Sequence, residues 1–204
     1  MFKIDKKEPV FFTKAKKGIK LPKNSNAWSD EKIAKIRSDL RNYILNNEQH
    51  NLCAYCERKI ESNSEKSNID HFKTRNLFPQ ETVAYDNLLV SCNNKKTCSS
   101  HKDKNIKSKE EYEKIVNPIT ENPDDFFDYL PTGEIVAKNQ KAKFTIEIFN
   151  LGTFEADNIV QSRKKLTQTI ENINLPLDEI LKCMNYEFQS FIINIYKKLQ
   201  GVTQ

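Results

Sequence analysis

The sequence predicts an α+β protein, a mainly helical chain around a small core of two strands and one helix that four cysteines hold together. Apolar residues recur at helical spacing in several long segments, and only 4 of the 204 residues are glycine. Two short strand candidates lie between two pairs of cysteines. Four of the five cysteines and two of the three histidines fall between residues 53 and 105. We therefore expect this stretch to organise the rest of the chain.

The composition predicts a soluble, cytoplasmic protein. No apolar run approaches the ~18 to 20 residues that a membrane-spanning helix needs, so we expect no membrane contact. The first residues, Met-Phe-Lys-Ile-Asp-Lys-Lys-Glu, lack the apolar core of a signal peptide. In the cytoplasm thiols stay reduced, and paired cysteines bind metal ions more often than they bind each other. The cysteine pairs are therefore candidate metal ligands.

Charge is distributed unevenly along the chain. Residues 1–30 carry 8 Lys and Arg against 3 Asp and Glu, and residues 53–109 carry 11 against 7. Residues 110–204 reverse the balance, with 10 against 15. A basic segment that coincides with the cysteines favours a partner rich in phosphate. The alternative is a lysine-rich surface that is only solvated.

The chain divides into three predicted segments. Residues 1–28 are rich in lysine and show no steady period, which predicts a basic N-terminal arm without regular structure. Residues 29–116 are expected to form a helix followed by the cysteine-bound core. Ser29 is a suitable N-cap, and apolar residues then recur on helical spacing to about Asn47. Residues 117–204 begin with a proline-containing linker and are expected to form a hairpin and several helices.

The third segment has its own sequence of predicted elements. These are a hairpin at 126–137 with its turn at Thr132-Gly133, a short helix or strand at 143–151 ended by Gly152, a helix at 154–173, and a last helix from about Pro176 to Leu199. The apolar stripe of the last helix contains Phe188, Phe191 and Ile195. It is either a docking surface for a partner or part of the core. Cys183 is expected to be a core residue.

The four clustered cysteines predict a structural zinc site. Zinc takes four ligands at tetrahedral corners, which two short cysteine turns supply. Cys53 and Cys56 have the usual spacing of two intervening residues, whereas Cys92 and Cys98 are separated by five. Cys92 and Cys98 can still bind the same ion, because the loop between them is long enough and only its conformation limits how the two thiolates are placed. The alternative is a set of buried free cysteines.

Between the cysteine pairs, an acid and an imidazole follow each other at Asp70-His71. Hydrolysis of a phosphodiester needs a base for the water, a cation near the leaving oxygen, and a group that orients the base. Residues next to each other on a strand point to opposite sides. Either the backbone is distorted at this pair, or one of the two residues has no catalytic role.

Together these motifs resemble the His-Asn-His (HNH) endonucleases, which have a ββα-metal fold. The matching stretches are Cys53-Ala-Tyr-Cys-Glu57, Ile69-Asp-His-Phe72, Asn87-Leu-Leu-Val-Ser-Cys92 and the run from Cys98 to Lys104. They are most similar to the PtuB-type HNH proteins of Septu and related retron antiphage systems. Only residues 53–105 carry specific motifs.

The resemblance implies a role for each matching residue. His71 would be the general base, and Asn87 would hold the loop that carries it through main-chain hydrogen bonds. Asp70 and His101 would bind the catalytic Mg²⁺ or a similar divalent ion. Cys53, Cys56, Cys92 and Cys98 would hold a structural zinc ion. The third family residue normally follows the last cysteine directly, whereas His101 stands three residues beyond Cys98. Its rivals for that position are Asn93, Asn94 and Asn105.

The predicted function is a metal-dependent HNH endonuclease that hydrolyses phosphodiester bonds of DNA or RNA. The basic residues expected to contact phosphate are those of the N-terminal arm together with Lys73, Arg75, Lys95, Lys96, Lys102, Lys104 and Lys107. The family resemblance implies a defence effector that acts with a PtuA-type ATPase, and in retron systems with a reverse transcriptase and its RNA-DNA hybrid. The alternative is a zinc module without catalysis that binds nucleic acid or a protein.

Overall fold

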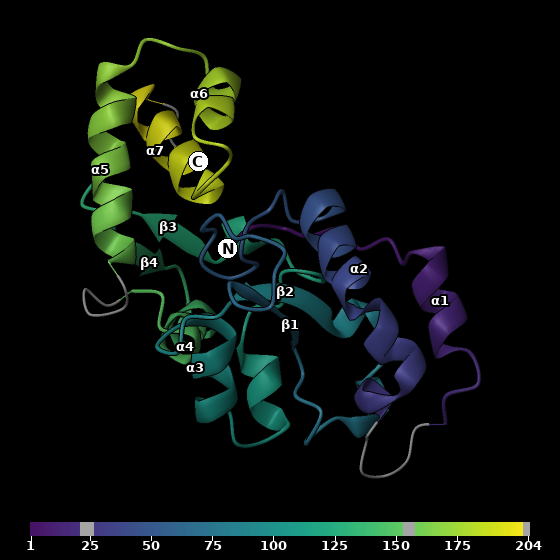
Figure 1. The fold of residues 1–204 in the computed structure, drawn as a ribbon. Coiled ribbons are helices and arrows are strands. Elements are labelled where there is room, and N and C mark those ends of the chain that lie inside the picture. Colours follow the sequence, from purple (N-terminus) through teal and green to yellow (C-terminus); the bar gives the residue numbers. More distant parts are fainter. Residues whose placement is uncertain (21–26, 153–157, 202–204) are drawn as a thin grey trace.

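The computed structural model of the chain describes residues 1–20, 27–152 and 158–201. It is an α+β structure with two small two-stranded sheets (Figure 1). The helices are α1 (Val10–Lys16), α2 (Glu31–Asn47), α3 (Cys98–Asn105), α4 (Gln140–Phe149), α5 (Ile159–Asn172), α6 (Leu177–Cys183) and α7 (Gln189–Leu199). The strands are β1 (Ser67–His71), β2 (Leu88–Cys92), β3 (Phe127–Tyr129) and β4 (Ile135–Ala137).

The β1–β2 sheet lies between two groups of helices. Helices α1 and α2 lie on one side of it, and α5, α6 and α7 gather with the β3–β4 hairpin at the other end of the molecule (Figure 1). Strands β1 and β2 are antiparallel, with Ile69 opposite Val90 and His71 opposite Leu88. Helix α3 follows directly and packs against both β2 and α4. The order strand, strand, helix is the one that the sequence predicts.

The N-terminal segment differs from the irregular arm that was predicted. It contains α1, and Phe2, Ile4 and Phe12 are buried in the core. Lys6 is also buried, with Nζ 2.5 Å from Oε2 of Glu48. Part of the positive charge counted in this segment therefore belongs to an internal ion pair, which composition alone does not distinguish from a phosphate-binding surface.

Helix α2 confirms the predicted amphipathic helix. Its N-cap is Asp30, whose side chain accepts a hydrogen bond from the Lys32 N–H at 2.9 Å. The predicted cap, Ser29, lies in a short 3₁₀ turn just before it. Ile33 and Leu40 are among the residues that α2 buries.

The predicted hairpin is confirmed, and the segment for which a helix or a strand was expected is a helix, α4. Strand β3 pairs with β4, and Gly133 at the turn has φ of +91°. Any Cβ atom on Gly133 would lie 2.1 Å from the carbonyl oxygen of Val160, so α5 packs directly onto the turn. Helix α4 ends at Phe149, and its C-cap is Asn150 in the left-handed conformation and not the predicted Gly152.

The predicted last helix is broken into two, α6 and α7. Glu57 binds the chain at the break: its carbonyl oxygen accepts from the Phe188 N–H at 3.0 Å, and its Oε2 accepts from the Ser190 N–H at 2.8 Å. The buried carboxylate thus caps the start of α7, where a negative charge is favourable. Local periodicity could not reveal this contact, because Glu57 is more than 130 residues away in the sequence.

Two predictions for this region are settled by burial. Phe188, Phe191 and Ile195 are at most 3% exposed, so the core alternative is confirmed and these residues form no docking surface. Cys183, predicted to be core, is exposed at the end of α6. One hydrophobic core contains residues from all three predicted segments. Within the described ranges, every helix is too short or too polar to cross a membrane.

Candidate functional site

The four clustered cysteines converge on one point. The Sγ atoms of Cys53, Cys56, Cys92 and Cys98 lie within 4.8 Å of one another. The Sγ atoms of Cys53 and Cys98 are 3.8 Å apart. Tetrahedral Zn–S bonds of about 2.3 Å separate two sulfurs by about 3.8 Å, so the donor set fits zinc. Among the described residues, this is the one group of three or more His, Cys, Asp or Glu side chains at metal-binding distance.

Local backbone geometry explains how both cysteine turns close. Glu57 and Cys98 have φ of +61° and +56°, so each turn contains a residue in the left-handed conformation. The Cys92 N–H donates to Sγ of Cys53 at 3.3 Å and joins the two turns. Burial opposes ionisation of Cys53, but hydrogen bonds from the neighbouring thiols lower its pKa well below the usual value. Thiolate is the form that binds zinc.

A polar cleft of about 440 Å³ lies beside the end of β1. It is lined by β1, the loop after β1 and one face of α3: Asn68, Ile69, Asp70, His71, Thr74, Arg75, Asn76, Leu77, Ser99, Ser100, Asp103, Ile106 and Lys107. Ser99 and Asp103 are four positions apart on α3, as expected of one helix face, and Lys107 lies just beyond the end of the helix. The cleft therefore brings both members of the Asp70-His71 pair together with α3.

His71 is a neutral, fixed imidazole. Its Nε2 atom lies 2.9 Å from the carbonyl oxygen of Thr82, and the edge of the ring contacts Trp28 at a centroid distance of 4.6 Å. Because a carbonyl only accepts, Nε2 carries the proton and Nδ1 holds the lone pair. Burial, helped by the positive charges of Arg75, Lys102 and Arg37, lowers the pKa of His71 to about 3, against the hydrogen bond to Thr82, which raises it. The ring is therefore in the form that can accept a proton at neutral pH.

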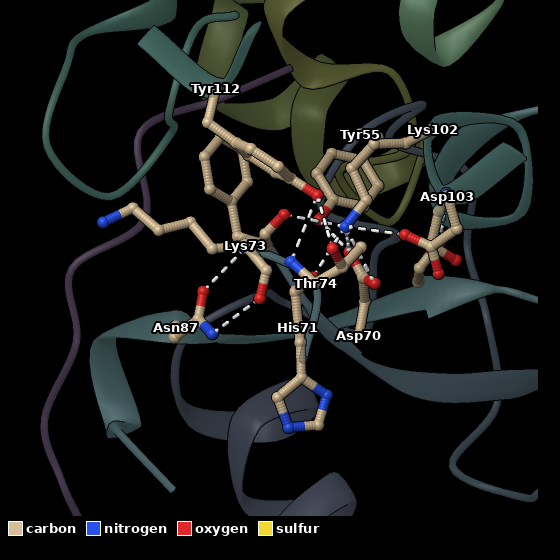
Figure 2. Close-up of polar contacts among 12 residues, drawn as sticks. Tyr55, Asp70, His71, Lys73, Thr74, Asn87, Lys102, Asp103 and Tyr112 are labelled. Carbon is tan, nitrogen blue, oxygen red and sulfur yellow. Dashed lines mark hydrogen bonds and ion pairs between the residues drawn. The ribbon is translucent and has the colours of Figure 1, made fainter. Parts of the chain in front are cut away.

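Asn87 holds the backbone just beyond His71. Its Oδ1 accepts from the Lys73 N–H at 2.7 Å, and its Nδ2 donates to the carbonyl oxygens of Lys73 at 3.0 Å and Glu81 at 3.2 Å (Figure 2). The main chain of Asn87 also accepts from the Phe72 N–H at 2.9 Å. These are the kind of contacts that the resemblance assigns to Asn87. Its contribution to catalysis stays a prediction.

Asp70 points away from the imidazole of its neighbour, as alternation along a strand requires (Figure 2). Its carboxylate accepts from the Tyr55 hydroxyl and lies 3.1 and 3.0 Å from the Nζ atom of Lys102. Burial raises the pKa of Asp70 to about 6, although the Lys102 ammonium pulls it down. Burial also opposes the charge on Lys102, but the carboxylates of Asp70 and Asp103 outweigh it and raise its pKa. The pair is therefore an ion pair at neutral pH.

The prediction that Lys102 contacts phosphate is wrong, because the structure buries this side chain completely. The other predicted contacts differ in exposure. Arg75 is exposed and lines the cleft, and Lys95, Lys96 and Lys104 are exposed beside the second cysteine turn. Lys73 is half-buried and pairs with Glu81 at 3.0 Å. Arg75 and Lys107 are thus the exposed predicted basic contacts that line the cleft.

His101 lies on another face of α3. Its Nδ1 atom is 2.8 Å from the carbonyl oxygen of Ile148 on α4, and it does not line the cleft. Its rivals also lie outside the lining. Asn93 bonds the side chain of Asn68 and the carbonyl oxygen of Ser64, and Asn94 accepts from the Lys96 N–H. Asn105 bonds back to His101. The structure does not bring His101 or any of the three asparagines to Asp70.

Several residues of the site carried no signal in the sequence. Tyr55 lies inside the first cysteine pair and donates to Asp70. Trp28 and Thr82 hold the imidazole of His71 but come from distant segments. Asp103 lies 3.2 Å from the Nζ atom of Lys102 and lines the cleft. Only Asp103 could have been found earlier, through its helical spacing from Ser99.

Comparison with known proteins gives one clear similarity, and no family model matches the chain. The chain is 30% identical to the Septu protein PtuB of Bacillus thuringiensis over 133 residues. The match covers 63% of this chain and 47% of that protein, so the chain spans about half the length of the relative. The similarity supports a relation to PtuB, and membership of the HNH family stays a prediction.

Proposed function

We propose that this protein hydrolyses phosphodiester bonds of nucleic acid, as the nuclease effector of a Septu-like antiphage defence system. The similarity to the Septu protein PtuB supports the defence role. The observation that carries the chemistry is His71, a neutral imidazole fixed by Thr82 and Trp28 at the edge of a polar cleft. A general base must be unprotonated and held in position, which His71 is, although a pKa nearer the working pH than about 3 would make it a stronger base.

In the proposed reaction His71 takes a proton from water. The resulting hydroxide attacks phosphorus, and the bond to the 3′ oxygen breaks in line with the attack. The leaving 3′ oxygen takes a proton from solvent, and His71 returns its proton to solvent. Nε2 of His71 stays bonded to Thr82, so the ring can take the proton at Nδ1 without turning. Asn87 keeps the loop after His71 in place through Lys73. Holding the reacting groups in position is a large part of catalysis by such small sites.

Positive charge at the cleft supports a phosphate substrate. Arg75 and Lys107 line the cleft, and Lys95, Lys96 and Lys104 are exposed on the adjoining loop and on α3. We expect these residues to contact the backbone of DNA or RNA, which positions the substrate without selecting a sequence. Binding should weaken steeply as the salt concentration rises.

The predicted divalent ion does not fit the predicted ligands in this arrangement. Carboxylate oxygen is a suitable ligand for Mg²⁺. However, both oxygens of Asp70 lie on the Lys102 ammonium, and His101 faces Ile148. A bound divalent ion would stabilise the charge that develops on the phosphate. The four cysteines, in contrast, fit a structural zinc ion.

We propose that the partner of this protein is a PtuA-type ATPase. The support is the similarity to PtuB and the name of the Septu system. The resemblance to retron-associated proteins implies a second candidate partner, a reverse transcriptase with its RNA-DNA hybrid. Co-purification with the ATPase, expressed from one operon, would test the first partner directly.

Cleavage can be tested with the zinc-loaded full chain, with and without the ATPase. The substrates are supercoiled plasmid and labelled single-stranded DNA and RNA. His71→Ala should reduce cleavage by about 10² to 10⁴-fold, the usual contribution of a general base. His50→Asn is the matched control: His50 is exposed and has φ of +51°, which asparagine tolerates. Equal cleavage by wild type and His71→Ala would remove the nuclease proposal.

The Asp70–Lys102 ion pair favours a second candidate function. A carboxylate that is neutralised inside the protein suits a zinc module without catalysis, which binds nucleic acid or a protein partner. In that case His71→Ala keeps its zinc and its affinity for nucleic acid. Neither wild type nor His71→Ala then cuts any of the substrates.

A further inference from the structure

A buried lysine occupies the polar centre between β1 and α3. The side chain of Lys102 has 0% exposure. Its Nζ atom lies 3.1 and 3.0 Å from the two oxygens of Asp70. It also lies 2.6 Å from the carbonyl oxygen of His71 and 2.8 Å from that of Phe72 (Figure 2). A carboxylate oxygen of Asp103 adds a fifth acceptor at 3.2 Å.

This set of oxygens is more than an ammonium group needs. A lysine has three N–H donors, so five acceptors must share them. Carboxylate and carbonyl oxygens in this number are the ligands that Mg²⁺ and Ca²⁺ take in proteins. The surroundings of Lys102 thus have the composition of a divalent-cation site, with the ammonium at its centre.

We propose that the Lys102 ammonium takes the place of a divalent cation at Asp70 and acts as the positioning residue for the strand end that carries His71. Lys102 binds the carbonyl groups of His71 and Phe72 from α3, while Asn87 binds the main chain of Lys73 from the other side. The two contacts together fix the backbone at the proposed base. The inference rests on the proposed function only for the role of His71, because the cation in the cage can be measured without any cleavage.

The first test compares wild type with Asp70→Asn. Both full-length, zinc-loaded proteins are titrated with Mn²⁺, and free Mn²⁺ is followed by electron paramagnetic resonance. Because Lys102 already neutralises Asp70, the two proteins should bind Mn²⁺ with the same stoichiometry and affinity. A Mn²⁺ ion that wild type binds and Asp70→Asn loses would overturn the proposal, whether or not the protein is a nuclease.

The second test empties the cage with Lys102→Met, a substitution of similar length without charge. This variant should gain a Mn²⁺ site at least about tenfold tighter than any in wild type, and millimolar Mg²⁺ should raise its melting temperature. The matched control is Asp70→Asn/Lys102→Met, which lacks both charges and should show neither effect. A purely structural lysine would not be replaced by Mg²⁺, so a folded Lys102→Met protein without these gains would contradict the proposal. If Lys102→Met does not fold, the Asp70→Asn comparison decides.

Discussion

At the scale of single residues, two neighbours on β1 are given opposite electrostatic environments. His71 is buried beside Trp28 and positive charges, so it stays neutral. Asp70 is buried beside the Lys102 ammonium, so it is ionised at neutral pH although burial raises its pKa to about 6. Alternation along the strand makes this possible, because it turns the two side chains to different surroundings.

The low pKa of His71 predicts a pH-dependent cost in stability. Above its unfolded pKa of 6.5, neither state binds a proton at this ring. Below 6.5 the unfolded chain binds a proton that the native protein, with a pKa of about 3, does not. As the pH is lowered from 6.5 to 3, the free energy of unfolding should therefore decrease by up to ~1.4 kcal/mol per pH unit.

The test compares wild type with His71→Gln in urea unfolding at pH 7 and pH 5. Between pH 7 and pH 5, the free energy of unfolding of wild type should decrease by about 2 kcal/mol more than that of His71→Gln. Asp70 acts with the opposite sign, because its raised pKa adds stability as pH falls through 6, but it is present in both proteins. Parallel loss of stability in the two proteins would show that His71 does not carry the effect.

At the scale of elements, local sequence determines the hairpin turn, whereas a residue from a distant segment contacts the chain between the last two helices. The turn at Gly133 is set by local chemistry and then serves as the platform for α5. The break between α6 and α7 is bound from outside, by the Glu57 carboxylate and carbonyl. Phe188, whose N–H donates to Glu57, takes the left-handed conformation at the break, as does Tyr186, whose N–H donates to Leu181.

Gly133→Ala is expected to separate α5 from the hairpin. The new Cβ would lie 2.1 Å from the Val160 carbonyl oxygen, at a φ of +91° that disfavours alanine. We expect a loss of about 3 kcal/mol or more in chemical unfolding. Gly18→Ala is the matched control: it has φ of +80° but no atom within 4 Å of the new Cβ, so it should cost only ~1 kcal/mol. Equal losses would mean that backbone strain alone, and not the contact with α5, determines the effect.

At the scale of the whole molecule, the cysteine cluster joins parts that are far apart in sequence. The first cysteine turn carries Tyr55, which binds Asp70, and Glu57, which caps α7. Cys98, the last residue of the second cysteine turn, is the first residue of α3, the helix that contains Lys102. The cluster therefore supports both the cleft and the packing of the C-terminal helices onto the rest of the core.

Zinc removal is expected to unfold more than the cysteine turns. The purified protein should contain one zinc ion per chain by elemental analysis, and a strong chelator should lower the melting temperature of the whole chain. Cys92→Ala should lose the zinc and several kcal/mol of stability, because structural zinc contributes directly to folding. Cys183→Ala should keep both, because Cys183 is exposed and lies outside the cluster. A zinc-free wild-type protein with an unchanged melting temperature would contradict this role.

The sequence alone determined the features that depend on near neighbours. The spacing of Cys53, Cys56, Cys92 and Cys98 predicted the metal cluster, apolar periodicity predicted α2, and the turn residues predicted the β3–β4 hairpin. Asp70, His71 and Asn87 were found by motif, and the structure gathers them at one strand end. These patterns are informative because backbone preference and ligand spacing act over a few residues.

Only the tertiary structure decided which way the polar side chains of α3 point and which charges are buried. A lysine and a histidine next to each other on α3 were predicted to contact phosphate and a metal ion. The structure buries Lys102 against Asp70 and turns His101 toward Ile148. Composition cannot separate a solvated charge from a paired one, since the energy of a buried ion depends on partners brought by distant segments. The same reason explains why only the tertiary structure shows the contact between Glu57 and the start of α7.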